Sequence, residues 1–108
     1  MYTILSIAER IQKGVIPPQE LSEMRMWLGA EYAFVGQKLT DIFVKKPALW
    51  GELRRQTKSD TSAERAWQAT EMGMQETRLR MELKTIEKLI GAVSSALRIL
   101  ENEARNLM

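Results

Sequence analysis

Cysteine and histidine are both absent from this sequence of 108 residues, and their absence excludes whole classes of chemistry. Without cysteine, the chain has no disulfide framework and no thiolate metal site, which suits a reducing compartment. Without histidine, it has no imidazole general base and no imidazole-based catalytic triad. We therefore expect no metal ion and no cofactor, and a protein that is not an enzyme.

Glycine-rich loops and long apolar runs are also missing. The six glycines stand singly, so no phosphate-binding loop is encoded. No stretch approaches the roughly 20 apolar residues that cross a bilayer. The N-terminus carries no basic segment before its short apolar patch, so we do not expect a signal peptide. These absences predict a cytoplasmic protein without membrane contact.

Carboxylate chemistry is the catalytic option that remains open. Glu20 and Glu23 form an E-x-x-E pair, which would suit the magnesium-binding helix of an all-helical nucleotide pyrophosphohydrolase. Glu31 follows near the edge of the apolar stripe of the same predicted helix. That fold needs a second acidic set, and no E-x-x-D or D-x-x-D follows later in the chain. Acidic residues in a first helical turn also stabilise the helix dipole, and we favour that simpler role.

The hydrophobic periodicity predicts an all-α fold, an antiparallel helical hairpin or bundle within a single domain, 1–108. Helices are expected at 3–14, 18–45, 47–56 and 61–107. The second should end or kink just before Pro47, because proline disfavours helical geometry in the preceding residue. The fourth should begin at a capping box made by Thr61 and Glu64, and should be long and coiled-coil-like.

The most regular pattern is a heptad ladder in the last third of the chain. Its apolar positions alternate in steps of four and three, the spacing that keeps one face of a helix against a partner helix. The ladder consists of Leu79, Leu83, Ile86, Ile90, Val93, Leu97, Leu100, Ala104 and Leu107. The other helices are too short to cover 61–107 unless the first helix also docks on it, so we expect a homo-oligomer with the ladder as its seam.

Two further features bear on helix packing. Small residues recur, and we expect them to be notches where helices approach closely: Gly29, Ala33 and Gly36 in the second helix, and Gly91, Ala92 and Ala96 in the last. Glu76 falls on a ladder position upstream of Leu79, where we expect it to pair with a basic residue such as Arg80.

Positive charge is concentrated in 37–59, which holds six basic and two acidic residues, whereas the segments on either side each carry a net charge of −1. A basic patch beside an aromatic ring can contact phosphates, although a solvated helix end and turn would give the same pattern. The candidate contact residues, for a protein partner or a nucleic acid, are Lys45, Lys46, Trp50, Arg54, Arg55 and Lys58. For Trp67, which stands among alanines, we favour burial.

The C-terminal half also carries a resemblance. The segments 62–73, 83–90 and 100–106 resemble the C-terminal half of small uncharacterised proteins encoded by tailed bacteriophages, among early genes for replication and recombination. The resemblance brings no catalytic residues and implies a context, the cytoplasm of an infected bacterium. We therefore expect a non-enzymatic interaction protein, either an accessory factor in phage DNA metabolism or an inhibitor of a host protein. The alternative is direct nucleic-acid binding by the basic patch, with Trp50 stacking on a base.

Overall fold

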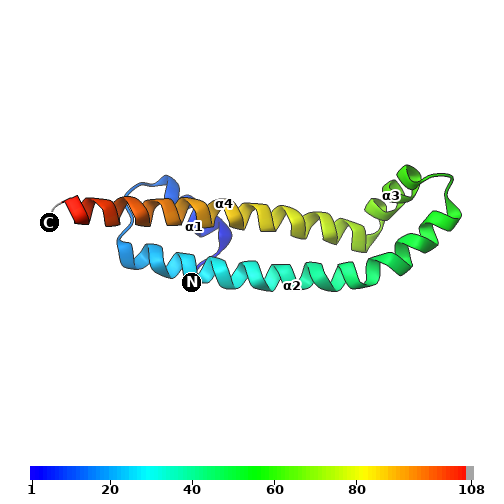
Figure 1. Ribbon diagram of the computed structural model, residues 1–108, viewed down its shortest axis with the longest axis horizontal. Coiled ribbons are helices and arrows are strands. Elements are labelled where there is room, and N and C mark those ends of the chain that lie inside the picture. Colours follow the sequence, from blue (N-terminus) through cyan, green and yellow to red (C-terminus); the bar gives the residue numbers. More distant parts are fainter. Residues whose placement is uncertain (107–108) are drawn as a thin grey trace. The chain divides into compact units, whose positions relative to one another are not determined.

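A computed structural model describes residues 1–106 and confirms the all-α fold class (Figure 1). The helices are α1 (Ile4–Gln12), α2 (Pro18–Gln56), α3 (Asp60–Ala69) and α4 (Glu71–Asn106), and this part of the chain contains no strand. The tertiary contacts form two compact units. Unit 1 comprises 1–33 and 84–106, and unit 2 comprises 34–83. Each unit contains one segment of α2 and an antiparallel segment of α4, and the expected single domain stays a prediction.

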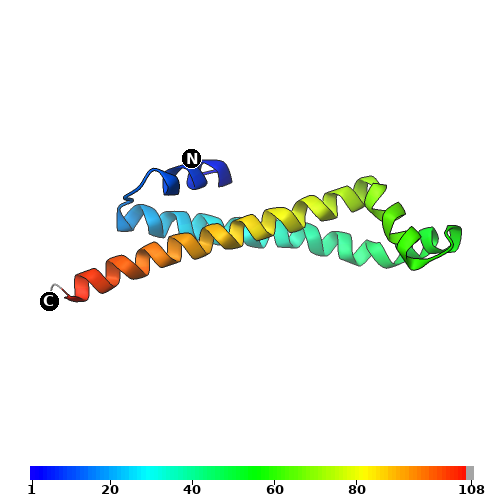
Figure 2. The ribbon, with the colours of Figure 1, turned by 90° about the horizontal axis from the view of Figure 1, so that it is seen from above.

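Unit 1 combines α1 with the start of α2 and the end of α4. A reciprocal capping box begins α1: the Ser6 amide donates to Thr3 Oγ1 at 2.9 Å, and the Thr3 amide donates to Ser6 Oγ at 2.8 Å. Gly14, at φ 111°, then turns the chain toward α2, whose first turns lie alongside α1 (Figure 2). The buried apolar side chains of unit 1 are Ile7, Ile16, Leu21, Met24, Leu28, Ile86, Val93 and Leu97.

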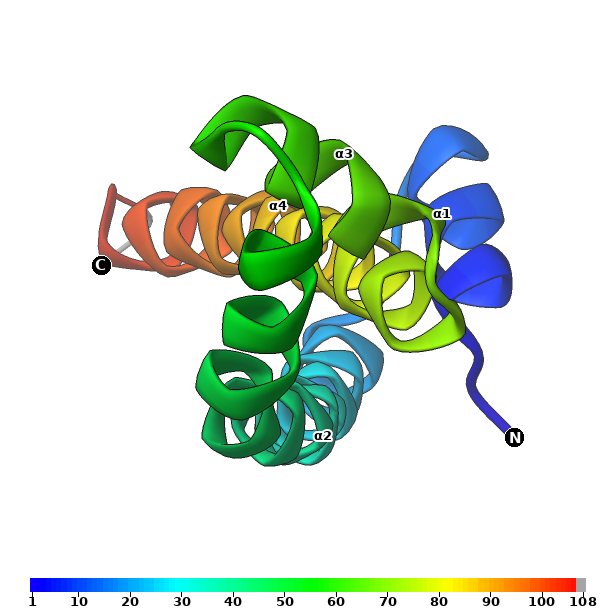
Figure 3. The ribbon, with the colours of Figure 1, turned by 90° about the vertical axis from the view of Figure 1, so that its right-hand side faces the viewer.

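Unit 2 combines the second half of α2 with α3 and the start of α4. Figure 3 shows α3 and the first turns of α4 next to the green part of α2. Its buried apolar side chains are Val35, Leu39, Ile42, Ala63 and Trp67. These residues come from α2 and α3. They share the interior with Glu76 of α4, and among residues 1–106 no other charged side chain is buried.

The predicted end of the second helix before Pro47 is wrong, because α2 continues through it to Gln56. Proline removes one backbone donor from a helix and crowds the preceding turn. Pro47 lies on the exposed face of α2, where water can satisfy the carbonyl that loses its partner. The contacts of Lys46 with Glu76 and of Trp50 with Glu64 hold the helix before and after the proline.

The predicted single helix over 61–107 is also wrong, because the chain bends at Thr70 between α3 and α4. Thr70 has extended backbone (ψ 157°) and serves both helices. Its hydroxyl donates to the Trp67 carbonyl at 2.6 Å and accepts from the Gly73 amide at 3.0 Å. The expected cap of Thr61 and Glu64 is replaced by Ser59, whose Oγ accepts from the Ser62 amide at 3.1 Å.

The ladder is partly covered within one chain. Ile86, Val93 and Leu97 are buried in unit 1, so these three positions need no second copy. The half-buried positions are Leu79, Leu83, Ile90 and Leu100; Ala104 is exposed, and Leu107 lies outside the described residues. The homo-oligomer therefore stays a prediction, with less of the ladder available to it.

Helices do not approach closely at the glycines where the sequence predicted it. A Cβ added at Gly29, Gly36 or Gly91 would meet nothing within 4 Å, so the prediction is wrong for these three glycines. A Cβ at Gly73 would lie 1.9 Å from the carbonyl oxygen of Trp67. The close approach is therefore at the α3–α4 corner.

Among the helices of residues 1–106, none combines the length and the apolar character needed to span a bilayer.

Candidate functional site

Lys46, a predicted contact residue, belongs instead to the interior of unit 2. Its Nζ lies 2.8 Å from Oε1 of Glu76 and 5.3 Å from the centroid of the Trp67 ring. Glu76 is 6% exposed, and its Oε2 also lies 3.9 Å from Nε of Arg80, which confirms the expected pairing of Glu76 and Arg80. Because a buried carboxylate needs a counter-charge, Lys46 turns inward and is not available to a partner.

Trp50 and Arg54 connect α2 to α3. Trp50 Nε1 donates to Glu64 Oε2 at 3.0 Å, and Nε of Arg54 lies 2.7 Å from Oδ1 of Asp60. Arg54 also donates to the Thr57 carbonyl at 3.1 Å. Both side chains therefore stabilise the turn between the two helices. The indole N–H of Trp50 is already satisfied, and the charge of Arg54 is compensated.

The remaining members of the predicted patch are Arg55, Lys45 and Lys58. Arg55 forms an ion pair with Glu52, three residues earlier on α2. Lys45 and Lys58 are exposed and make no ion pair within residues 1–106. The structure thus disperses the predicted patch: three of its six members are occupied in contacts between or within helices, one is drawn inward, and two remain free cations.

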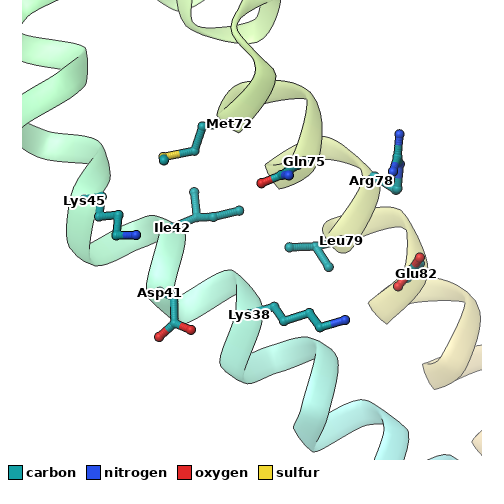
Figure 4. A pocket seen from close by; sticks show the side chains of 9 residues that line it. All are labelled: Lys38, Asp41, Ile42, Lys45, Met72, Gln75, Arg78, Leu79 and Glu82. Carbon is teal, nitrogen blue, oxygen red and sulfur yellow. The ribbon is translucent and has the colours of Figure 1, made fainter.

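A groove of about 500 Å³ lies between α2 and α4 in unit 2, and we call it the basic groove (Figure 4). Its lining residues are Lys38, Asp41, Ile42, Lys45, Met72, Gln75, Arg78, Leu79 and Glu82. Figure 4 shows Ile42 and Leu79 facing each other across the gap, with Lys38 extending from α2 toward α4. Lys45 is the one member of the predicted contact set that lines it.

The charges of the basic groove are largely uncompensated inside the chain. Lys45 and Arg78 form no ion pair among the described residues, and the Lys38 ammonium lies 4.6 Å from the centroid of the Phe34 ring. Asp41 accepts a hydrogen bond from the Gln37 side chain at 3.1 Å. Three cations and two carboxylates therefore surround an apolar floor. Such a surface can hold an amphipathic ligand that carries negative charge.

The acidic residues considered for magnesium chemistry lie in unit 1. Glu20 Oε1 is 3.1 Å from Nε of Arg10, and Glu23 accepts a hydrogen bond from the Tyr2 hydroxyl at 3.1 Å. These contacts join α2 to α1 and to the segment before it, and Glu31 is half-buried. Within residues 1–106, no three Asp or Glu side chains are grouped closely enough to hold a metal ion.

Sequence reasoning missed Arg78 and Glu82 as members of a site, and it placed Lys38 in the basic patch without including it among the contact residues. Lys38 and Lys45 are seven residues apart, two helical turns, so their common face on α2 was a readable signal. Arg78 lies on α4, and its approach to that face depends on how the two helices pair.

A comparison of the chain with protein-family models, curated proteins and solved structures finds no match in any of the three.

Proposed function

We propose that this chain is a non-enzymatic binding protein that holds an acidic, amphipathic segment of a partner protein in the basic groove. The observation that supports the proposal is the position of the free cations Lys45 and Arg78 beside the apolar side chains of Ile42 and Leu79. A helix with leucines on one face and carboxylates at the edges of that face would place both kinds of group against matching partners.

A partner protein fits the basic groove better than a nucleic acid does. Asp41 and Glu82 line the groove and would repel a phosphate backbone, whereas a helix can direct its own apolar or basic side chains toward them. The indole of Trp50, the expected stacking platform for a base, is half-buried and donates to Glu64. The excess of positive charge around the groove is one, which favours selective pairing over general attraction to a polyanion.

Direct nucleic-acid binding is the second candidate, and one observation favours it. Lys45, Lys58 and Arg78 are exposed and lack carboxylate partners among the described residues. Cations of this kind release counterions when they meet phosphates, so binding would weaken steeply with salt. This candidate requires that an oligonucleotide bind at low salt. The dependence of the logarithm of its binding constant on the logarithm of salt concentration should become less steep when those cations are removed.

The proposal can be tested by fluorescence anisotropy with a labelled synthetic helix that carries leucine on one face and glutamate at the edges of that face. The Lys45→Glu/Arg78→Glu variant should bind this helix about tenfold or more weakly, because two attractive pairs become repulsive. The Lys84→Glu/Lys88→Glu variant is the matched control. It makes the same change in net charge on exposed residues of α4 in unit 1 and should bind like the unaltered chain.

Equal losses in both variants would show that only overall charge matters and would contradict the basic groove as the site. A single-stranded oligonucleotide, titrated in parallel, separates the two candidates. If the oligonucleotide binds and the acidic helix does not, nucleic-acid binding replaces the proposed function.

The biological setting follows from the resemblance rather than from the groove. We propose a phage accessory factor in DNA replication or recombination, or an inhibitor of a host protein, acting as a homo-oligomer. In that setting, the acidic segment would belong to a protein of the infected cell. Oligomerisation would strengthen each individually weak contact through avidity.

A further inference from the structure

The indole N–H of Trp67 lacks a hydrogen-bond partner. Among the described residues, Nε1 of Trp67 is a buried side-chain polar atom with no acceptor in reach, and the whole side chain is 1% exposed. Such orphans are rare in native proteins, and each calls for an explanation. The indole nitrogen can only donate, so the missing group must be an acceptor.

Trp67 lines a second groove of unit 2, with a volume of about 490 Å³, which we call the acidic groove. The groove is bordered by the end of α2, by Trp67 and Thr70, and by the start of α4. The lining residues that bear on recognition are Leu49, Glu52, Leu53, Trp67, Glu71 and Met72. This volume lies within the range of about 300–1,000 Å³ that is typical of ligand sites.

The acidic groove is opposite in character to the basic groove, although both include Met72 and Gln75. Its charged lining residues are Glu52 and Glu71, and no basic residue lines it. Glu52 pairs with Arg55, whereas Glu71 makes no ion pair among the described residues. A ligand for this groove must therefore supply a positive charge.

Apolar surface completes the recognition pattern. Leu49, Leu53 and Met72 line the groove, and Leu49 is 45% exposed although it is a large apolar side chain. Met72 is unbranched and adopts several rotamers at little cost, so it can adjust to an inserted side chain. Nε1 of Trp67 exposes less than 1 Å², so an acceptor reaches it only when the surrounding side chains shift.

We infer that the acidic groove is a second binding site, for a segment of a partner protein with an apolar side chain next to a lysine or arginine. The apolar side chain would pack on Leu49, Leu53 and Met72, and the cation would pair with Glu71. A backbone carbonyl of the segment would accept a hydrogen bond from the indole N–H of Trp67. This site does not depend on the basic groove, and the two can be tested separately.

The test follows the indole N–H resonances of the ¹⁵N-labelled full chain during titration with N-acetyl-leucyl-argininamide. The Trp67 indole is assigned with the Trp67→Phe variant. Its proton should move downfield in a saturable way, because the N–H gains an acceptor. N-acetyl-leucyl-glutaminamide, which keeps the leucine and the carbonyls but lacks the cation, should bind several-fold more weakly.

Glu71→Gln provides the second arm, because Glu71 is exposed and its replacement leaves the interior of unit 2 intact. This variant should bind the two probes with equal affinity, whereas Lys45→Glu/Arg78→Glu should retain the preference for the arginine probe. An unmoved Trp67 indole would overturn the proposal. So would an undiminished preference in Glu71→Gln, or equal shifts of the indoles of Trp27, Trp50 and Trp67.

Discussion

At the scale of single residues, the ion pair of Lys46 and Glu76 joins α2 to α4 inside unit 2. The carboxylate is almost fully buried, and the Lys46 side chain is 24% exposed. Removing one partner of such a pair leaves a charge without compensation in a poorly solvated site, which destabilises the fold. Replacing both partners by apolar side chains can leave the free energy of unfolding nearly unchanged.

We therefore expect Glu76→Leu to lower the free energy of unfolding by about 2–3 kcal/mol, less than for a fully buried pair because Lys46 retains contact with water. The double variant Lys46→Met/Glu76→Leu should recover most of that loss. Urea denaturation of the two single variants and the double variant gives the coupling energy. Simple additivity of the single losses would mean that the pair contributes no coupling to unit 2.

Tyr32 makes the stability of unit 1 sensitive to alkaline pH. Its hydroxyl donates to Glu87 Oε1 at 3.0 Å, linking α2 to α4. This hydrogen bond, followed by the negative charge of Glu87 and by burial, raises the pKa of Tyr32 above its ordinary value of 10.0. A raised pKa in the folded state means that the stabilisation is complete below pH 10 and is lost as the pH rises through the folded value.

Tyr32→Phe should therefore be less stable than the unaltered chain at pH 8, with a difference that shrinks above pH 10. Thermal denaturation of both proteins across this range measures the difference directly. Comparing the two proteins removes the contribution of lysines that titrate in the same range. A difference that stays constant between pH 8 and pH 11.5 would show that the hydrogen bond to Glu87 has no linkage to folding.

At the scale of elements, the α3–α4 corner depends on glycine for steric reasons. Gly73 is buried, and an added Cβ would meet the Trp67 carbonyl oxygen at 1.9 Å. Gly73→Ala should lower the free energy of unfolding by about 2–3 kcal/mol, because the backbone must move to make room for the added methyl group. Gly91→Ala is the matched control: it is exposed in the same helix, has open space, and should stabilise the chain by about 1 kcal/mol. Equal effects of the two substitutions, measured by urea denaturation, would contradict the tight corner.

Helix positions were predictable from the sequence more readily than helix breaks. The apolar periodicity of α2 and α4 is a local property, and it predicted both. The break at Thr70 arises because one threonine caps two helices while Trp67 is buried beside it, and no proline or tandem glycine marks the position. The expected break at Pro47 failed for the converse reason, since tertiary contacts on the inner face of α2 outweigh a local preference.

The candidate site was predictable only where its residues share a helix. Lys45 was identified because its charge lies in a basic stretch of sequence, and that argument included Lys46 equally. Which of two neighbouring lysines turns inward depends on Glu76, thirty residues away. Arg78 joins the basic groove, and Trp67 the acidic groove, through pairing of helices that charge patterns along the chain do not encode.

At the scale of the whole molecule, self-association remains the main prediction drawn from the heptad ladder. Unit 1 buries Ile86, Val93 and Leu97. A groove of about 240 Å³ that includes Val93 is also lined by Val15, Ile99 and Leu100. Val15 is 92% exposed and Ile99 is 57% exposed.

Light scattering after size-exclusion chromatography should therefore give a mass above the 12.4 kDa of one chain. The Ile99→Glu variant should return the mass to that of one chain, because a charge is costly in an apolar interface. A monomeric mass for the unaltered chain at high concentration would mean that the cover provided by α1 and α2 is sufficient.

The most direct test of the central proposal is to locate the acidic synthetic helix on the ¹⁵N-labelled chain by chemical-shift mapping. The proposed function predicts that saturable shifts concentrate on the residues of the basic groove, led by Lys38, Lys45 and Leu79. In Lys45→Glu/Arg78→Glu, the same shifts should require about tenfold or more of the synthetic helix. Shifts that spread over unit 1, or that survive unchanged in this variant, would contradict the assignment of the basic groove as the contact surface.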